Sequence, residues 1–149
     1  MIRVAELKAT ELETVDGRLP LNRLGENGEE HSTYLIAWKD AQPVGHAYIA
    51  WTGTHLGLPE IQDVFVPEER RHGVATQLTH AAEEKARGRG WNSISLSVSE
   101  EGNAPARILY AKLGYVDAGV DPVRVSGQVM LRGRPFDVDD SLVYLVKDL

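Results

Sequence analysis

Apolar residues recur along the chain with two spacings, one typical of helices and one typical of strands, and the segments with these spacings follow one another in turn. Apolar residues at helical spacing predict helices over residues 74–87 and about 104–112, with glycines closing the first of them. Short alternating or β-rich runs predict strands at residues 2–7, 33–38, 44–51, 61–66, 92–98, 115–118 and 141–147. The pattern therefore predicts a sheet whose strands are joined by both turns and helices.

The connections predict how these strands pair. A five-residue turn, 39–43, joins two strands into an antiparallel hairpin, whereas the strands at 61–66 and 92–98 are linked by a helix and should be parallel. Residues 8–31 are expected to hold one or two short helices, and residues 123–138 a hairpin or an active-site flap. The predicted fold class is a mixed α/β sheet, α+β in type, mostly antiparallel with one parallel pair and helices on both faces.

Composition restricts the kind of protein. A chain of 149 residues with 42% hydrophobic and 26% charged residues suits a single globular domain, residues 1–149. The formal charge of -6 argues against a nucleic-acid partner, and the lack of cysteine excludes disulfides, thiolate metal sites and an acyl-cysteine intermediate. Neither a secretory signal nor an apolar run of the ~18 residues needed for a membrane span is visible. We therefore expect a cytoplasmic protein without a membrane partner.

A strand, a basic glycine turn and a helix start follow one another between residues 60 and 82. The strand ends before Pro67, and the turn at residues 70–75 leads into the helix. Backbone N–H groups at such a helix start have no intrahelical partner, and the helix dipole adds partial positive charge, so the segment can hold a phosphate or pyrophosphate. Its spacing differs from a Walker loop, which argues against a nucleoside-triphosphate enzyme, and from a dinucleotide fingerprint.

Two motifs in this part of the chain occur in a characteristic order. The first, Arg70-Arg71-His72-Gly73-Val74-Ala75, has the pattern Arg-x-x-Gly-x-Ala. The second, Asn103-Ala104-Pro105-Ala106-Arg107-Ile108-Leu109-Tyr110-Ala111-Lys112-Leu113-Gly114-Tyr115, has the pattern Asn-x-x-Ala-x-x-Leu-Tyr-x-x-Leu-Gly-Tyr. Together they resemble the GNAT superfamily of acyl-CoA-dependent N-acyltransferases. The resemblance covers residues 60–116 and implies an acetyl-CoA-dependent N-acetyltransferase with the GNAT fold.

That resemblance implies where acetyl-CoA, the acyl donor, would bind. Backbone groups of Val64, Phe65 and Val66 would hold the pantetheine arm, and one N–H would polarise the thioester carbonyl. The pyrophosphate would lie on the amides of Arg71, His72, Gly73, Val74, Ala75 and Thr76. Asn103 would cap its helix or bind a pantetheine amide. The alternative for residues 64–66 is a buried strand without a ligand.

Tyr110 falls where the family places its general acid, which protonates the departing CoA thiolate. A phenol with an ordinary pKa of about 10 is protonated at neutral pH, while a thiolate of pKa about 8.5 accepts a proton readily. The alternative for Tyr110 is a helix tyrosine that packs with Leu109 and Leu113. Tyr110 is the first candidate for a catalytic residue.

An amine acceptor must lose a proton before it attacks, because an alkylammonium has no lone pair at pH 7. Glu60 begins the strand where several family members place a general base, and it ranks first. Asp63 ranks second, followed by His46 or His72. Before any bulge is considered, Glu60 would share a strand face with Val64, and Asp63 would point to the opposite face. The alternatives are a solvated carboxylate at Glu60 and a water chain that carries the proton.

The remaining candidate groups fit less specific roles. The histidines lack His-x-x-x-His spacing and cysteine partners, so no metal site is expected. Trp51, at a strand end, is a candidate for the wall of the acceptor pocket, with a cation–π role available. The expected acceptor is a small-molecule amine or a peptide. Relatives often pair as homodimers, and the resemblance allows one here.

A second function class also fits the resemblance. A noncatalytic acyl-CoA-binding or sensory module would have the same fold and the same pyrophosphate loop. Retention of Tyr110 beside an intact Arg-x-x-Gly-x-Ala loop favours the enzyme. The sequence therefore favours an N-acetyltransferase whose acceptor it does not identify.

Overall fold

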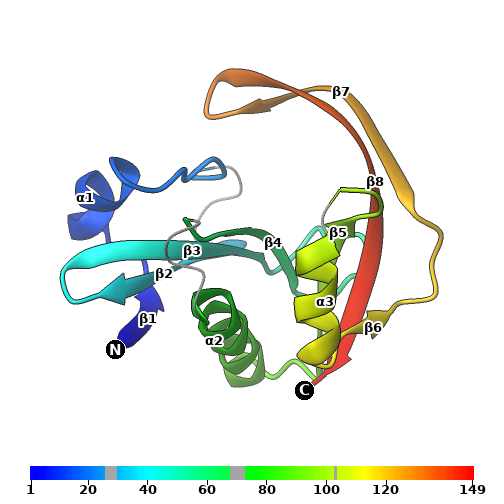
Figure 1. Ribbon diagram of the computed structural model, residues 1–149, viewed down its shortest axis with the longest axis horizontal. Coiled ribbons are helices and arrows are strands. Elements are labelled where there is room, and N and C mark those ends of the chain that lie inside the picture. The colour runs from blue at the N-terminus through cyan, green and yellow to red at the C-terminus, as the bar shows by residue number, and fades with distance from the viewer. Residues whose placement is uncertain (26–29, 68–72, 103) are drawn as a thin grey trace.

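The described part of the chain folds into a curved eight-stranded sheet with helices on both sides (Figure 1). The structure, a computed structural model, describes residues 1–25, 30–67, 73–102 and 104–149. The first elements are β1 (Ile2–Glu6), η1 (Ala9–Glu11), α1 (Leu12–Asp16), β2 (Ser32–Lys39), β3 (Gln42–Ala50) and β4 (Glu60–Phe65). They are followed by α2 (Val74–Gly88), β5 (Ser93–Ser99), α3 (Ala104–Lys112), β6 (Val116–Asp117), β7 (Val123–Leu131) and β8 (Arg134–Asp148).

The strands lie in the order β1-β2-β3-β4-β5-β8-β6, and β7 pairs with β8. The described strand pairs are antiparallel except β4 and β5, which confirms the predicted parallel pair. The predicted β2–β3 hairpin is also confirmed, although the five-residue turn was wrong. Lys39 pairs with Gln42, and Asp40 takes a φ of 55° in the tight connection between them. Pro43 therefore lies within β3, where it pairs with Trp38.

Successive residues of the central strands pack on opposite sides of the sheet. We call one side the α1 face, on which Tyr34 and Tyr48 pack with Val15 of α1. The other side is the α2 face, on which Leu35 and Ala47 pack with residues of α2 and α3. Figure 1 shows α1 on one side of the sheet and α2 and α3 on the other, so the prediction of helices on both faces is confirmed.

A glycine in β3 allows α2 to approach the sheet closely. A Cβ at Gly45 would lie 3.1 Å from the Phe65 carbonyl oxygen, 3.1 Å from Val74 Cγ1 and 3.3 Å from Leu78 Cδ1. These separations are tighter than most side chains tolerate in a well-packed core. Gly45 therefore brings the first turn of α2 against the end of β4.

The C-terminal part of the chain forms a long hairpin arm. We use "the arm" for β7 and the part of β8 that pairs with it, residues 123–142. The hairpin expected at residues 123–138 is confirmed, but the final strand, expected at 141–147, begins much earlier, at Arg134. The arm curves away from the sheet and back toward the loop after α1 (Figure 1). At its tip the Arg132 guanidinium donates to both carboxylate oxygens of Asp16, at 2.6 and 3.0 Å.

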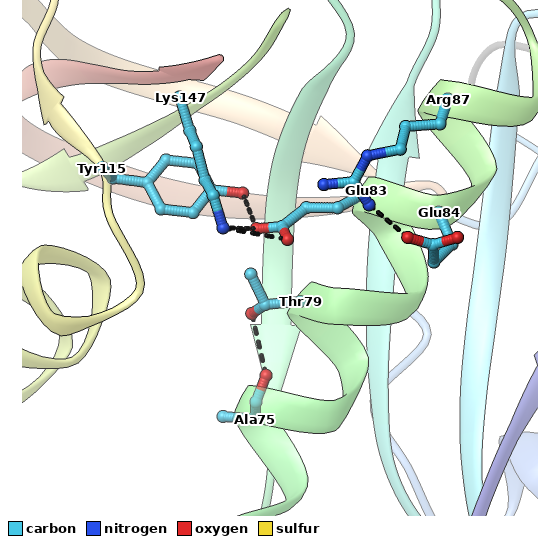
Figure 2. A network of polar contacts seen from close by, with 7 residues as sticks. All are labelled: Ala75, Thr79, Glu83, Glu84, Arg87, Tyr115 and Lys147. Carbon is cyan, nitrogen blue, oxygen red and sulfur yellow. Dashed lines mark hydrogen bonds and ion pairs between the residues drawn. The ribbon is translucent and has the colours of Figure 1, made fainter. Parts of the chain in front are cut away.

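A buried polar cluster joins α2, β8 and the chain segment after α3 (Figure 2). Glu83 of α2, only 2% exposed, accepts hydrogen bonds from the Tyr115 hydroxyl at 2.9 Å and from Lys147 Nζ at 3.1 Å. The Lys147 side chain also passes within 3.5 Å of the Cβ position of Gly114, whose φ is +97°. Tyr115, which is 3% exposed, thus anchors the end of α3.

Candidate functional site

Strands β4 and β5 pair at one end only and then separate. Their parallel pairing is limited to Glu60 with Ser95 and Ile61 with Leu96. This end is held by the Pro59 carbonyl, which accepts the Ser95 amide at 2.8 Å and the Ser95 hydroxyl at 3.0 Å. Beyond it lies a cavity of about 420 Å³, which we call the β4–β5 cleft. Ligands of open α/β sheets bind in crevices of this kind, at the carboxyl ends of parallel strands.

The first turn of α2 opens onto the β4–β5 cleft. Gly73 is the N-cap residue, with a left-handed φ of 81°, and no described side chain caps the helix there. The N–H groups of Val74, Ala75 and Thr76 therefore lack the intrahelical partners that later residues have. Ala75 lines the cleft itself. The helix dipole adds positive character at this point, so the turn can receive an anionic group.

Tyr110 of α3 closes the other side of the cleft. Its side chain is 7% exposed and lines the cavity, while its ring meets that of Tyr115 edge-on at 5.8 Å between centroids. Burial raises the pKa of Tyr110 to about 12, so its hydroxyl stays protonated at neutral pH. Among the described residues we find no hydrogen-bond partner for the Tyr110 hydroxyl. The Tyr115 hydroxyl, in contrast, donates to Glu83.

Glu60 lies beside the closed end of the cleft. The residue is 4% exposed; its Oε2 accepts a hydrogen bond from Gln62 at 3.1 Å, and its Oε1 is buried without a partner among the described residues. Burial raises the pKa of Glu60, although the Gln62 hydrogen bond and the nearby Arg23 and His55 oppose the shift. A carboxylate with a raised pKa and one free oxygen is suited to accept a proton near neutral pH.

A β-bulge in β4 changes which residues share a face. Asp63 pairs with Tyr48 and Ile61 with Ile49, so Gln62 is an extra residue in β4. Glu60 and Asp63 therefore both lie on the α1 face, and Val64 lies on the α2 face. An unbroken strand would place Glu60 on the face of Val64, as expected before any bulge was considered, and the bulge places it on the face of Asp63 instead.

The other predicted residues are distributed over both faces. Val64 and Val66 line the β4–β5 cleft, whereas Phe65 points to the α1 face and stacks on His46 at 5.8 Å. His46 is fully buried, and its Nε2 donates to the Pro20 carbonyl at 3.0 Å. Burial lowers the pKa of His46, so it is uncharged inside the fold. Arg71, His72 and Asn103 lie outside the described residues.

Trp51 does not line the face that carries Glu60. It is 3% exposed, belongs to the core on the α2 face, and donates from its indole nitrogen to Thr33 Oγ1 at 2.9 Å. The guanidinium of Arg89 stacks on its ring at 4.0 Å. The expectation of a pocket-wall tryptophan was therefore wrong, although the cation–π role is present with a cation of the chain itself.

Residues near Glu60 that the sequence did not single out come from distant segments. Tyr144 of β8 is 7% exposed and stacks on His55, with ring centroids 4.6 Å apart. Burial, and then the charge of Glu60, raises the pKa of Tyr144. Arg23, from the loop after α1, lies close enough to affect the pKa of Glu60. The alternation of residues 141–147 placed Tyr144 on one strand face, but no sequence signal pointed to Arg23.

Two classes of site find no support in the described residues. In residues 1–25, 30–67, 73–102 and 104–149, no group of histidine, aspartate and glutamate side chains is arranged to hold a metal ion. Within the same ranges, none of the helices is both long and apolar enough to span a bilayer.

Comparison with known proteins supplies the family. A family model described as the acetyltransferase (GNAT) family matches residues 3–115, most of the chain and far more than the two motifs. The chain belongs to the GNAT acetyltransferase family. No curated protein matches its sequence.

Solved GNAT structures are similar over nearly the whole of both chains. An acetyltransferase from Bacillus subtilis in complex with CoA is 21% identical, with a TM-score of 0.73, and the match covers 100% of this chain and 99% of that one. Nourseothricin acetyltransferase is 20% identical, with a TM-score of 0.70 and coverage of 99% and 98%. The ribosomal-protein-S18-alanine N-acetyltransferase from Escherichia coli is 16% identical, with a TM-score of 0.71 and coverage of 99% and 94%. These TM-scores show that the fold is shared.

Acetyl-CoA is the acyl donor of the GNAT family, and the β4–β5 cleft of this chain fits it. The separated strands leave backbone groups of Val64 to Val66 without a β5 partner, which suits an extended pantetheine chain. The glycine-capped start of α2 suits the pyrophosphate. Tyr110 lies across the cleft from β4. Of the residues that the sequence assigned to the donor, Val64, Val66 and Ala75 line the cleft, and the Phe65 side chain lies on the α1 face.

Proposed function

We propose that this GNAT protein transfers the acetyl group of acetyl-CoA to a primary amine, with Tyr110 as general acid and Glu60 as general base. The observation that carries the proposal is the placement of two complementary groups, one lining the β4–β5 cleft and the other beside the end where β4 and β5 are paired. Tyr110 lines the cleft as a neutral phenol, and Glu60 lies at its closed end with one buried oxygen free. Backbone N–H groups of residues 64–66 would hold the thioester carbonyl.

Glu60 and Tyr110 can together accept and donate every proton that moves in this reaction. Glu60 takes a proton from the ammonium of the acceptor, which exposes the nitrogen lone pair. The nitrogen then forms a bond to the thioester carbon, and the carbon–sulfur bond breaks. Tyr110 gives its proton to the departing thiolate and regains one from the newly formed amide nitrogen. The proton on Glu60 leaves to solvent, and no acyl-enzyme forms.

The acetyl-CoA step is tested first by calorimetry on the purified protein, with CoA and dephospho-CoA as comparisons. Thiol release is then followed in the same samples with a panel of primary amines. We expect micromolar binding and thiol release that depends on an amine. Binding without thiol release from any amine would contradict the enzyme and favour the noncatalytic acyl-CoA module. No binding at millimolar acetyl-CoA would contradict both.

The assignment of Tyr110 is tested by Tyr110→Phe, which keeps the ring and removes the hydroxyl. We expect acetyl-CoA affinity to stay within twofold of wild type and kcat to fall by roughly 10²–10⁴, the usual contribution of a general acid. Tyr115→Phe is the matched control, because Tyr115 is equally buried but its hydroxyl bonds to Glu83. An unchanged kcat for Tyr110→Phe would remove this residue from the mechanism.

A further inference from the structure

Tyr144 and Glu60 face each other across a strip of serines. Glu60 pairs with Ser95, and Tyr144 pairs with Ser97, so the two residues flank β5 on either side. Residues on either side of them in sequence, Ile61 and Val143, pack in the core of the α2 face, which places Glu60 and Tyr144 on the α1 face. With a strand spacing of about 4.8 Å and a two-residue offset, their Cα atoms are about 12 Å apart. Ser95 and Ser97, which lie between the two larger residues, have short side chains.

Each of the two residues brings an oxygen that the described chain leaves free. Glu60 Oε1 is fully buried without a partner. Tyr144 is 7% exposed, and within the described residues its contact is the ring of His55, with no hydrogen bond to its hydroxyl. A buried carboxylate oxygen without a donor is costly, so its position indicates a donor supplied by a ligand.

The surroundings set the charge that such a ligand would meet. Glu60 is faced by Gln62 on β4, His55 on the loop before β4, Arg23 on the loop after α1 and Tyr144 on β8. The side chains of β3 and β5 that pair with Glu60, those of Ala50 and Ser95, carry no charge. Arg23 is thus the cation that faces Glu60, and the atoms that Glu60 and Tyr144 themselves offer to an ammonium group are one carboxylate oxygen and one phenol oxygen.

The space also adjoins the donor side. Ser97 lies opposite Tyr144 and lines the β4–β5 cleft as well. A group held between Glu60 and Tyr144 would therefore lie next to the cleft in which the thioester would be bound. This is the position required of a nucleophile that must approach the donor within contact distance.

We propose that Tyr144 is an acceptor-binding residue that, together with Glu60, holds the amine of the substrate by two of its N–H groups and thereby selects primary amines. The inference rests on the proposed function and deepens it. Glu60 Oε1 accepts one N–H, and the Tyr144 hydroxyl oxygen accepts a second. The third N–H of the ammonium is directed to the cleft. Once Glu60 has taken the proton it accepts, rotation about the carbon–nitrogen bond turns the lone pair to the cleft while an N–H stays on Tyr144. A secondary amine has one N–H fewer after deprotonation and loses this arrangement.

Tyr144→Phe tests this role because it keeps the ring on His55 and removes only the oxygen. We expect unchanged acetyl-CoA affinity by calorimetry, an increase of tenfold or more in KM for a primary amine, and a smaller decrease in kcat. We also expect the ratio of kcat/KM for a primary amine over its N-methyl derivative to fall at least threefold. Tyr115→Phe, on the opposite face, should change neither the amine KM nor this ratio.

A second variant gives a result even if Tyr144→Phe folds poorly, which thermal unfolding would reveal. Ser97→Thr keeps a hydroxyl and adds one methyl group between Glu60 and Tyr144, so we expect a higher KM for the amine. Because Ser97 also lines the β4–β5 cleft, this KM is measured at an acetyl-CoA concentration that saturates the variant. An active wild-type enzyme whose amine KM and primary-to-secondary ratio are unaffected by both variants would overturn the role of Tyr144 alone. A wild-type protein that acetylates no amine would instead contradict the proposed function.

Discussion

Gly45→Ala is the sharpest test of how the fold positions the start of α2. The added Cβ would lie 3.1 Å from both the Phe65 carbonyl oxygen and Val74 Cγ1, and 3.3 Å from Leu78 Cδ1. Two of these atoms belong to α2 and one to the end of β4, so any relief of the contact moves the two sides of the cleft relative to β3. The backbone at Gly45 needs no left-handed φ, and the clash is therefore the main effect.

The size of the effect follows from two opposing contributions. Overfilling a packed core costs about 1–3 kcal/mol. Replacing glycine in a strand recovers about 0.5–1 kcal/mol of backbone entropy. The net loss is then about 0–2.5 kcal/mol, which for a chain of this size lowers Tm by up to about 10 °C. Acetyl-CoA should bind up to about tenfold more weakly, because up to 1.4 kcal/mol of that strain falls on the cleft.

Scanning calorimetry and acetyl-CoA titration on the same preparation measure both quantities. Gly88→Ala is the matched control, because a Cβ at Gly88, the last residue of α2, meets nothing within 4 Å. It should leave Tm unchanged or raise it slightly and should not affect acetyl-CoA binding. If Gly45→Ala has the Tm and the acetyl-CoA affinity of wild type, the close approach of α2 to β3 does not hold the cleft in place.

Three other perturbations examine the rest of the fold. Asp16→Asn should release the arm tip, seen as faster amide exchange there, at a cost below about 1 kcal/mol because the pair is partly exposed. Its hydrogen bond with Arg132 lowers the pKa of Asp16, so wild type should lose the contact only as the pH falls below 3.8. Arm-tip amides of wild type that are no better protected from exchange at neutral pH than those of Asp16→Asn would contradict this. Lys147→Met should cost about 3–5 kcal/mol in urea unfolding by leaving the Glu83 carboxylate buried without its cation, and adding Glu83→Leu should recover part of the loss. His46 has a lowered pKa, so stability should decrease as the pH falls below 6.5, where the unfolded chain gains a proton that the folded chain excludes, and His46→Gln should flatten that slope.

Local sequence patterns predicted the fold where a single local property decides the structure. The spacing of apolar residues sets the helices at 74–88 and 104–112 because each must cover the same face of the sheet. The parallel pairing of β4 and β5 follows from the helix between them, since a crossover of that length cannot form a tight turn. The glycine in the turn predicted the start of α2, because Gly73 has a φ of 81° that few other residues take.

The sequence failed where the structure depends on contacts between distant segments. The bulge at Gln62 is set by the pairing of β4 with β3, and no residue type within β4 predicts it. The contact of Arg132 with Asp16 joins residues far apart in the chain, and Tyr144 reaches Glu60 only because β8 lies beside β5. The first half of β8 was missed because acidic residues such as Asp137 and Asp139 interrupt its apolar pattern, and these side chains are exposed.

Gln62, the extra residue in β4, shifts the alternation of side chains between the two faces of this otherwise regular strand. A strand with an unbroken period of two would carry Glu60 into the apolar core beside α2, where a carboxylate could meet neither water nor an amine. Deleting Gln62 would make Ile61 and Asp63 neighbours opposite Ile49 and Tyr48, so Glu60 should keep its face and lose the hydrogen bond that Gln62 donates to it. In this chain the extra residue also donates the hydrogen bond that Glu60 Oε2 accepts, so a single position both forms the bulge and sets the orientation of the Glu60 carboxylate.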